Sequence, residues 1–223
     1  MRLLRISAMA AGLAVLLSHA GAAQDGRQFK DAWFWGAKAG MLSYSSATTT
    51  NGGAPLVGGE WLITRTNGGL YISYDQAFFT TYGGFPDRDP DSSFTRNVKI
   101  QNLRRFTMAG MAFPMQTNRL HPYVGFGISF NQIAGTSLLG SFANSTRQAL
   151  AVETVQSMKT GVSPIFIAGL QARYNPASVF VQSTMSPIQG AFFLSNPTSS
   201  QSFNFSLELG VRYNVGSSID RAR

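Results

Sequence analysis

The clearest hydrophobic pattern of the chain lies near its C-terminus, where apolar residues occupy every second position of residues 203–215. The apolar positions are Phe203, Phe205, Leu207, Leu209, Val211, Tyr213 and Val215. Every position between them is polar or glycine. A period of two is the pattern of a β-strand with one apolar face. It fits a half-buried strand of a soluble β-sandwich as well as a membrane strand, so the other segments must decide.

Residues 121–131, HPYVGFGISFN, place bulky and small side chains on opposite faces of a strand. The bulky face consists of Val124, Phe126, Ile128 and Phe130. The opposite face consists of Gly125, Gly127, Ser129 and Asn131. The lumen of a small barrel is only wide enough for side chains, so small residues suit its inside and bulky residues its lipid-facing outside. A soluble sandwich would turn the bulky residues inward, and residues 163–175 repeat the same division.

Counting all alternating segments predicts an eight-stranded barrel. The expected strands are residues 32–44, 57–66, 70–78, about 98–113, 121–131, 163–175, 178–185 and 203–215. The second and third form a hairpin around the turn sequence Asn67-Gly68-Gly69. We therefore expect an all-β fold: a closed, antiparallel, up-and-down transmembrane β-barrel.

The connections between these segments alternate in length, which is the topology of outer-membrane barrels. Long loops are expected at residues 45–55, 80–95, 133–162 and 186–202. Short turns are expected at residue 67 and at residues 115–120 and 175–177. An even number of strands then places both termini and the tail 216–223 on the short-turn side, which is periplasmic in such barrels.

Aromatic residues gather at the inferred strand ends, as expected of two interfacial girdles. The periplasmic girdle is predicted to contain Trp33, Trp35, Phe113, Tyr174 and Tyr213. The outer girdle is predicted to contain Phe78, Phe79, Phe130 and Phe203.

Composition supports one apolar folded domain and excludes several classes of protein. Of the 223 residues, 44% are hydrophobic and only 13% are charged, which excludes a disordered chain. The absence of cysteine excludes disulfides, thiolate chemistry and a lipid-anchored cysteine. The net charge of +8 comes from scattered basic residues, so we expect no binding of nucleic acid.

The N-terminus is typical of a secretory signal peptide. Arg2 and Arg5 precede an apolar run from about Ala8 to Leu17, and small residues follow at positions 20–22. We expect residues 1–22 to be the signal peptide and residues 23–223 to be the barrel domain with a short periplasmic tail. The later sequence contains no run of about 18 apolar residues, so an exported chain of this kind is a periplasmic domain or an outer-membrane barrel.

The sequences HPYVGFGISF (121–130) and LELGVRYNV (207–215) resemble the OmpA-like and OmpX-like family of small outer-membrane barrels. The resemblance covers nearly all of the mature chain and implies an eight-stranded barrel in the bacterial outer membrane, without a specific activity. The chain departs from the family pattern because eight residues follow Val215, and Tyr213 takes the place of a final aromatic residue.

Polar residues assigned to the lumen carry both signs of charge. They are Lys38, Glu60, Asp75, Gln171, Arg173, Glu208 and Arg212. We interpret them as a salt-bridge network that plugs the barrel; the alternative is a gated polar path. Within the longest loop, residues 145–159 carry Ala149, Val152, Val155 and Met158 at helical spacing, which indicates either a short helix over the barrel mouth or a mobile surface loop.

Three functions remain open at this stage. The first is a structural, surface-interaction or adhesion role without catalytic machinery. The second is sideways transport of small apolar molecules, if Leu62, Phe106 and Phe180 face inward. The third is a lipid-modifying enzyme, which would need His121, the one histidine outside the signal peptide, as a general base; a capping or solvated role beside Pro122 at a turn is the simpler interpretation.

No catalytic, cofactor-binding or metal-binding residues are expected, and no cofactor is assigned. The expected partners are outer-membrane lipid and lipopolysaccharide, with periplasmic chaperones and the barrel-assembly machinery during biogenesis. We expect a monomer that does not bind nucleic acid.

Removal of the first 22 residues is directly testable. The basic start, the apolar run and the small residues at positions 20–22 match the requirements of signal peptidase. N-terminal sequencing of the protein from outer-membrane fractions should therefore begin near Ala23. A sequence that begins at Met1 would contradict the prediction.

Overall fold

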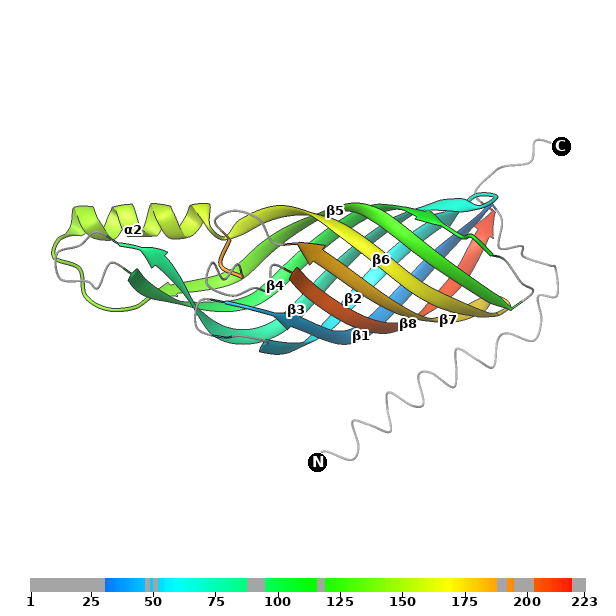
Figure 1. The fold of residues 1–223 in the computed structure, drawn as a ribbon, viewed down its shortest axis with the longest axis horizontal. Coiled ribbons are helices and arrows are strands. Elements are labelled where there is room, and N and C mark those ends of the chain that lie inside the picture. Colours follow the sequence, from blue (N-terminus) through cyan, green and yellow to red (C-terminus); the bar gives the residue numbers. More distant parts are fainter. Residues whose placement is uncertain are drawn as a thin grey trace, which may run out of the picture.

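Eight antiparallel strands close into one barrel (Figure 1). The structure is a computed structural model and describes residues 31–46, 49, 52–87, 95–115, 119–187, 192–194 and 203–217. The strands are β1 (Ala32–Tyr44), β2 (Gly52–Thr64), β3 (Gly68–Pro86), β4 (Thr95–Ala112), β5 (Leu120–Leu138), β6 (Thr160–Tyr174), β7 (Ala177–Pro187) and β8 (Phe203–Ser217). Each strand pairs with the next, and β8 pairs with β1. The predicted fold class and the eight predicted strands are confirmed.

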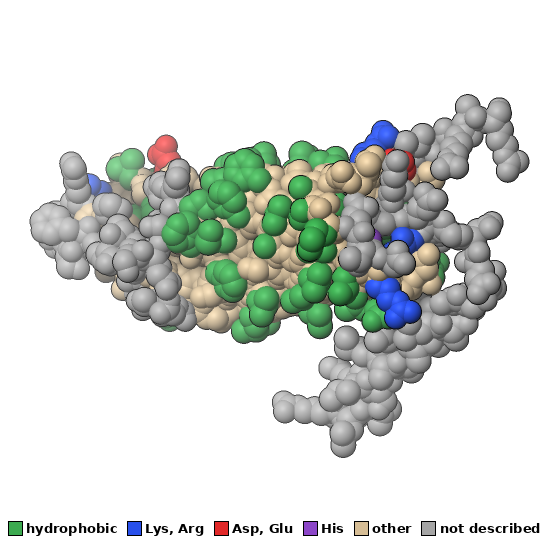
Figure 2. Space-filling model, turned by 45° about the vertical axis from the view of Figure 1, so that its right-hand side comes forward, with side chains coloured by type: hydrophobic (Ala, Val, Ile, Leu, Met, Phe, Trp, Pro, Cys, Tyr) green, Lys and Arg blue, Asp and Glu red, His purple; other side chains and the backbone are tan. Residues whose placement is uncertain are grey.

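The alternation read from the sequence is the alternation between the outside and the inside of this barrel. In β8 the side chain of Leu209 is 61% exposed, whereas its neighbour Glu208 is 1% exposed. Figure 2 shows hydrophobic side chains over the middle of the barrel, while the charged side chains of that face lie towards its two ends. A closed barrel with an apolar outer band satisfies all its backbone hydrogen bonds internally, which is the condition for strands to cross a bilayer.

The two ends of the barrel differ in their connections. At one end, the turn end, residues 65–67, 113–119 and 175–176 connect strands, and Ala32 pairs with Ser217. At the opposite end, the loop end, the two connections 139–159 and 188–202 are much longer than any turn-end connection, and the first of them contains the helix α2 (Ser145–Ser157). Both ends of the strand sequence therefore lie at the turn end, as predicted.

Most of the predicted girdle residues do face outward. Trp33, Trp35, Tyr174 and Tyr213 are exposed at the turn end, and Phe78, Phe130 and Phe203 are exposed towards the loop end. The prediction is wrong for Phe113, which is buried, and for Phe79, which packs against the inner core. Alternation itself places both side chains inside: Phe79 lies between the inward positions Ala77 and Thr81, and Phe113 lies two positions after the inward Met111.

Several predicted loops are shorter than expected because strand pairing continues beyond the apolar band. β3 runs to Pro86 and β4 begins at Thr95, so half of the loop expected at residues 80–95 belongs to these two paired strands. β5 likewise continues to Leu138, and β2 begins at Gly52. Outward positions there, such as Gln101 and Ser137, are polar and exposed. The sequence pattern weakens there because a strand surrounded by water needs no apolar outer face.

Of the two alternatives for residues 145–159, a helix or a mobile loop, the structure contains the helix, α2. Asn144 caps its N-terminus by accepting a hydrogen bond from the backbone N–H of Arg147 at 2.9 Å. Ala151 and Val155 are buried against the inner residues of the long strands. Figure 1 shows the helix alongside the projecting ends of β3, β4 and β5, parallel to the long axis of the barrel and not across its mouth.

Among the described residues, no helix is long and apolar enough to cross a membrane. The predicted signal peptide, residues 1–22, and the end of the tail, residues 218–223, lie outside the described residues. Cleavage of the signal peptide therefore stays a prediction.

A charge placed on the outer face should be costly in the middle of β8 and tolerated at its end. Leu209 lies midway between the exposed rings of Tyr213 and Phe205, whereas Val215 lies beyond Tyr213 at the turn end. We expect Leu209→Arg to lower the free energy of unfolding by about 2–4 kcal/mol and Val215→Arg by about 0–1 kcal/mol.

The measurement is urea unfolding of the refolded barrel in phosphatidylcholine vesicles. The two variants carry the same new charge on the same strand, so the comparison isolates depth. Equal losses of stability would mean that Leu209 does not face the hydrocarbon interior.

Candidate functional site: a charged network in the lumen

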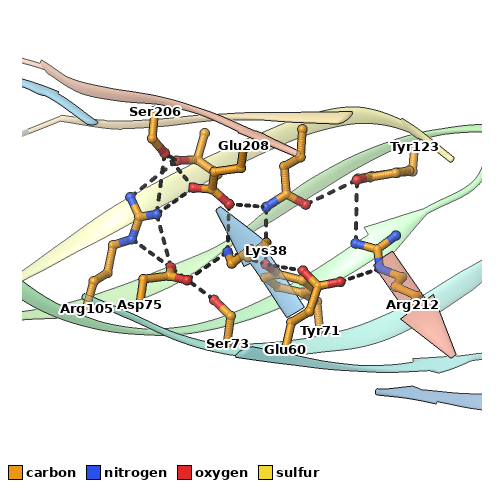
Figure 3. Close-up of polar contacts among 12 residues, drawn as sticks. Lys38, Glu60, Tyr71, Ser73, Asp75, Arg105, Tyr123, Ser206, Glu208 and Arg212 are labelled. Atoms are coloured by element: carbon orange, nitrogen blue, oxygen red, sulfur yellow. Dashed lines mark hydrogen bonds and ion pairs between the residues drawn. The ribbon is translucent and has the colours of Figure 1, made fainter. Parts of the chain in front are cut away.

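The barrel lumen holds a connected set of buried polar side chains to which all eight strands contribute. Figure 3 shows the part of this set around Lys38, Tyr71 and Glu208. The members of the whole set are Lys38 (β1), Glu60 (β2), Tyr71 and Asp75 (β3), Arg105 (β4), Tyr123 (β5), Gln171 (β6), Gln182 (β7) and Ser206, Glu208 and Arg212 (β8). We call this set the lumen network. Its side chains point inward because they occupy the alternate positions opposite the apolar outer face.

Four charged groups form the centre of the network. The Lys38 ammonium lies 2.9 Å from an Asp75 oxygen and 2.7 Å from a Glu208 oxygen. The Arg105 guanidinium contacts the same two carboxylates at 3.1 and 2.8 Å. Each cation therefore contacts both carboxylates. Removing four charges from water costs free energy. The close contacts of each cation with both carboxylates offset that cost, which a single loose ion pair would not do.

Arg212 and Glu60 form a second charged pair, nearer to the turn end. The Arg212 guanidinium also donates a hydrogen bond to the side-chain oxygen of Gln171 at 2.6 Å. Its central carbon lies 4.0 Å from the ring centroid of Phe180, which is a cation–π contact. The guanidinium is therefore held on several sides by groups from different strands.

Tyr71 and Gln182 join the two charged groups. The Tyr71 hydroxyl accepts a hydrogen bond from Lys38 at 2.9 Å and donates one to Glu60 at 3.1 Å. The Gln182 amide donates to the Tyr71 hydroxyl at 3.1 Å and to Glu208 at 3.0 Å. The network is therefore one hydrogen-bonded unit, and the loss of one member affects the others.

Inward glycines make room for the large side chains of the network. A Cβ atom at Gly36 would lie 2.9 Å from the Glu60 carboxylate, and one at Gly58 would overlap the Asp75 carboxylate. The ring of Tyr123 lies over Gly169 in the same way. Glycine on the inner face, which the sequence pattern singled out, thus gives the ionic side chains their space.

Apolar side chains close the lumen on both sides of the network. The turn-end cluster contains Ala32, Phe34, Leu62, Ala109, Met111, Phe113, Ile165 and Ile167 together with the rings of Tyr71 and Tyr123. The loop-end cluster contains Leu42, Tyr44, Ala54, Leu56, Ala77, Phe85, Val98, Ile100, Leu103, Ile133, Ala151, Val155, Phe192, Phe193 and Leu194. On the β5–β7 side, hydrogen-bonded Ser129, Asn131, Ser163 and Ser186 line the lumen instead.

Phe192 and Phe193 enter the lumen from the connection between β7 and β8. Their rings pack over strand glycines: a Cβ atom at Gly83 would lie 2.7 Å from Phe193, and one at Gly161 would lie 3.2 Å from Phe192. Both side chains are buried. These two side chains therefore help to close the lumen at the loop end.

Six of the seven residues predicted for the lumen lie there and belong to the network. They are Lys38, Glu60, Asp75, Gln171, Glu208 and Arg212. The prediction is wrong for Arg173, which donates hydrogen bonds to the side chain of Asn175 at the turn between β6 and β7. Arg173 is the penultimate residue of β6, where a long side chain can extend to the rim.

The lumen residues predicted from the sequence did not include Tyr71, Arg105, Tyr123, Gln182 and Ser206 of the network. Strict alternation in β7 would have placed Gln182 inside with Phe180, because Val179 and Val181 face outward. Arg105 is harder to assign because Arg104 precedes it. Asn102, which has φ of 54°, interrupts the alternation of β4 just before this pair, so counting from the start of the strand assigns the wrong arginine to the lumen.

The residues considered for other functions do not form a second site. Leu62 and Phe180 face inward as considered, but Phe106 is 38% exposed on the outer face. His121 is buried within β5 at the turn end, opposite Gln171 in the register. Of the capping or solvated role predicted for it, the solvated role is therefore wrong. The described part of the chain contains no group of three or more His, Cys, Asp or Glu side chains that could hold a metal ion.

The charged pair near the turn end offers a test of the network. We expect Arg212→Gln to destabilise the barrel by about 3–5 kcal/mol, because it leaves Glu60 buried without its cation. The double variant Glu60→Gln with Arg212→Gln removes both charges and should regain most of that loss. Urea unfolding in vesicles measures both, and additive losses in the double variant would show that the two groups are not coupled.

Comparison with known proteins identifies the fold. No protein-family model matches the chain, and no curated protein matches its sequence. The crystal structure of Neisserial surface protein A (NspA) superposes with a TM-score of 0.53 at 12% identity, covering 81% of this chain and 96% of that one. Ail of Yersinia pestis gives a TM-score of 0.48 at 8% identity, covering 83% of this chain and 99% of that one. This chain has the fold of the small eight-stranded outer-membrane β-barrels.

Proposed function

We propose that this protein is an integral barrel of the bacterial outer membrane that conducts no solute and acts through the surface it presents at the loop end. The observation that carries the proposal is the ordered projection formed by the ends of β3, β4 and β5 together with α2 (Figure 1). In outer-membrane barrels the short turns face the periplasm and the long connections face the exterior. The projection then extends from the cell.

Arg96 is the residue that holds the projection together. It forms an ion pair with Asp87 at 2.5 Å and donates hydrogen bonds to the backbone carbonyls of Leu139 and Ser141 at 3.3 and 2.9 Å. Its guanidinium also lies 4.1 Å from the ring centroid of Phe142. Arg96 thereby fixes the segment before α2 onto the β3–β4 hairpin, which supports a surface of defined shape.

Both flanks of α2 carry an exposed apolar side chain in a position where lipid does not explain it. Leu150 is 52% exposed and Val152 is 42% exposed, while Ala151 and Val155 anchor the helix inward. Because α2 is anchored by Ala151 and Val155, these two side chains are held in defined positions where another molecule can contact them. We therefore propose an adhesion or surface-interaction role over a purely structural one.

The two alternatives receive less support from the arrangement of the lumen. Transport through the barrel would need a path, whereas the network and the two apolar clusters occupy the lumen. The sideways path considered for apolar molecules needs Phe106 inside, and its ring is outside. We propose no catalytic role for His121, which lies at the end opposite the projection.

Surface variants of α2 test the proposal. We expect cells that express Leu150→Ser with Val152→Ser to attach to epithelial monolayers several-fold less than cells with the unchanged protein, because the contact surface is lost. The substitutions leave the anchoring residues Ala151 and Val155 in place. Heat-modifiable mobility in gels should therefore be unchanged.

Two controls separate the candidate functions. A Thr154→Ser variant, on the same helix, retains a hydroxyl and should attach like the unchanged protein. Recordings in planar bilayers should show no stepwise conductance for any variant. Unchanged attachment of the Leu150/Val152 variant would contradict the surface role, and steady conductance of the unchanged protein would favour transport.

A further inference from the structure

The outer face of the barrel carries one groove whose polar and apolar sides are separated. The groove has a volume of about 410 Å³ and crosses β3 to β6 towards the loop end. Arg104, Gln132 and Thr160 line it on one side. Tyr74, Phe106 and Phe130 line it on the other. The side chains of these six residues are exposed and point outward from the barrel.

The strand register explains this separation. Arg104 is paired with Gln132, and Gln132 with Thr160, so these three form one outward row across β4, β5 and β6. Two residues closer to the turn end on each strand, Phe106 is paired with Phe130, and Phe130 with Val162. The polar row therefore lies next to the apolar row, on its loop-end side. The groove thus has the polarity of a lipid whose headgroup points towards the loop end.

The depth of the groove matches the edge of the apolar band. Arg104 shares its row of paired residues with Leu209, through Ala39, Val57 and Gln76. The row climbs from Ala39 in the middle of β1 to Thr160, the first residue of β6 at the loop end. Neighbouring strands lie about 4.8 Å apart and are tilted by about 40°, so a row of paired residues rises about 3 Å along the barrel axis at each strand. Four such steps lead from Leu209 to Arg104 and place Arg104 about 12 Å nearer to the loop end. This is close to half the height of an apolar band of about 25 Å.

Arg104 is a cation without an anionic partner at that level. It has no hydrogen bond or ion pair with any side chain in the described ranges. The carboxylates of the membrane-spanning strands, Glu60, Asp75 and Glu208, all lie in the lumen. A guanidinium offers a planar fork of donors that suits a phosphate, and the Gln132 amide and the Thr160 hydroxyl add further donors beside it.

We propose that this groove binds a phosphorylated acyl lipid of the outer leaflet. Arg104, Gln132 and Thr160 contact the phosphate, and the acyl chain lies along Tyr74, Phe106 and Phe130. The chemistry recognised is a lipid phosphate at the membrane surface. The site is independent of the contact surface on α2, so a failure of the proposed attachment function leaves it unaffected.

Native mass spectrometry of the detergent-purified barrel tests the site with dioleoyl phosphatidic acid as the probe. We expect Arg104→Gln to weaken binding of the first lipid by about tenfold or more, the loss expected for a charge-assisted bidentate contact. Phe106→Ala should also weaken lipid binding, because the acyl chain loses its apolar contact with the Phe106 ring. Dioleoylglycerol, which lacks the phosphate, should bind both proteins equally weakly.

Arg65→Gln is the matched control, since Arg65 is exposed at the turn end and its removal changes the net charge by the same amount. It should bind phosphatidic acid like the unchanged protein, and heat-modifiable mobility confirms that each variant is folded. Equal binding by Arg104→Gln and the unchanged protein would overturn the proposal, as would equal losses in the Arg65 and Arg104 variants. Displacement of the lipid by millimolar inorganic phosphate, with no effect of Phe106→Ala, would assign the groove to free phosphate.

Discussion

The narrow lumen is the constraint on which the rest of this structure depends. Eight strands enclose a space that side chains fill, so a charge placed there must find its partner among the other inward residues. Lys38, Arg105 and Arg212 are matched by Glu60, Asp75 and Glu208. Apolar clusters on both sides keep water from this centre, and inward glycines such as Gly36 and Gly58 leave space for it.

The same strands meet three environments, and their sequence changes accordingly. Within the apolar band each strand alternates between lipid and lumen, as Leu209 and Glu208 do. At the upper edge of the band Arg104 and Gln132 replace apolar residues on the outer face. Beyond it, β3, β4 and β5 continue with mainly polar outer positions such as Gln101 and Ser137, with the exposed Tyr82 as an exception, and Arg96 joins these strands to the segment before α2. Transmembrane anchoring and surface presentation are therefore parts of one continuous sheet.

The strands and most of the network could be predicted from the sequence, because alternation shows both where a strand runs and which of its side chains face the lumen. β8 shows this best, since one face is wholly apolar and Glu208 and Arg212 lie on the other. The pattern failed where geometry departs from a period of two or where the surroundings change. The irregularity at Asn102 concealed Arg105, and the strand extensions of β3 and β5 carry no apolar outer face. Which inward charges pair depends on the register between strands, which a single strand's pattern does not contain.

The pair between Lys38 and Glu208 has a consequence for how the barrel comes to be closed. These residues lie on β1 and β8, the first and last strands, and they meet across the seam where the sheet joins itself. While the seam is open, Lys38 and Arg105 still have Asp75, but Glu208 on β8 is separated from both of its cations. An incompletely joined sheet within the membrane thus carries unneutralised charge. The ionic centre therefore disfavours an intermediate in which β8 has not yet joined β1, and it favours completion of the barrel.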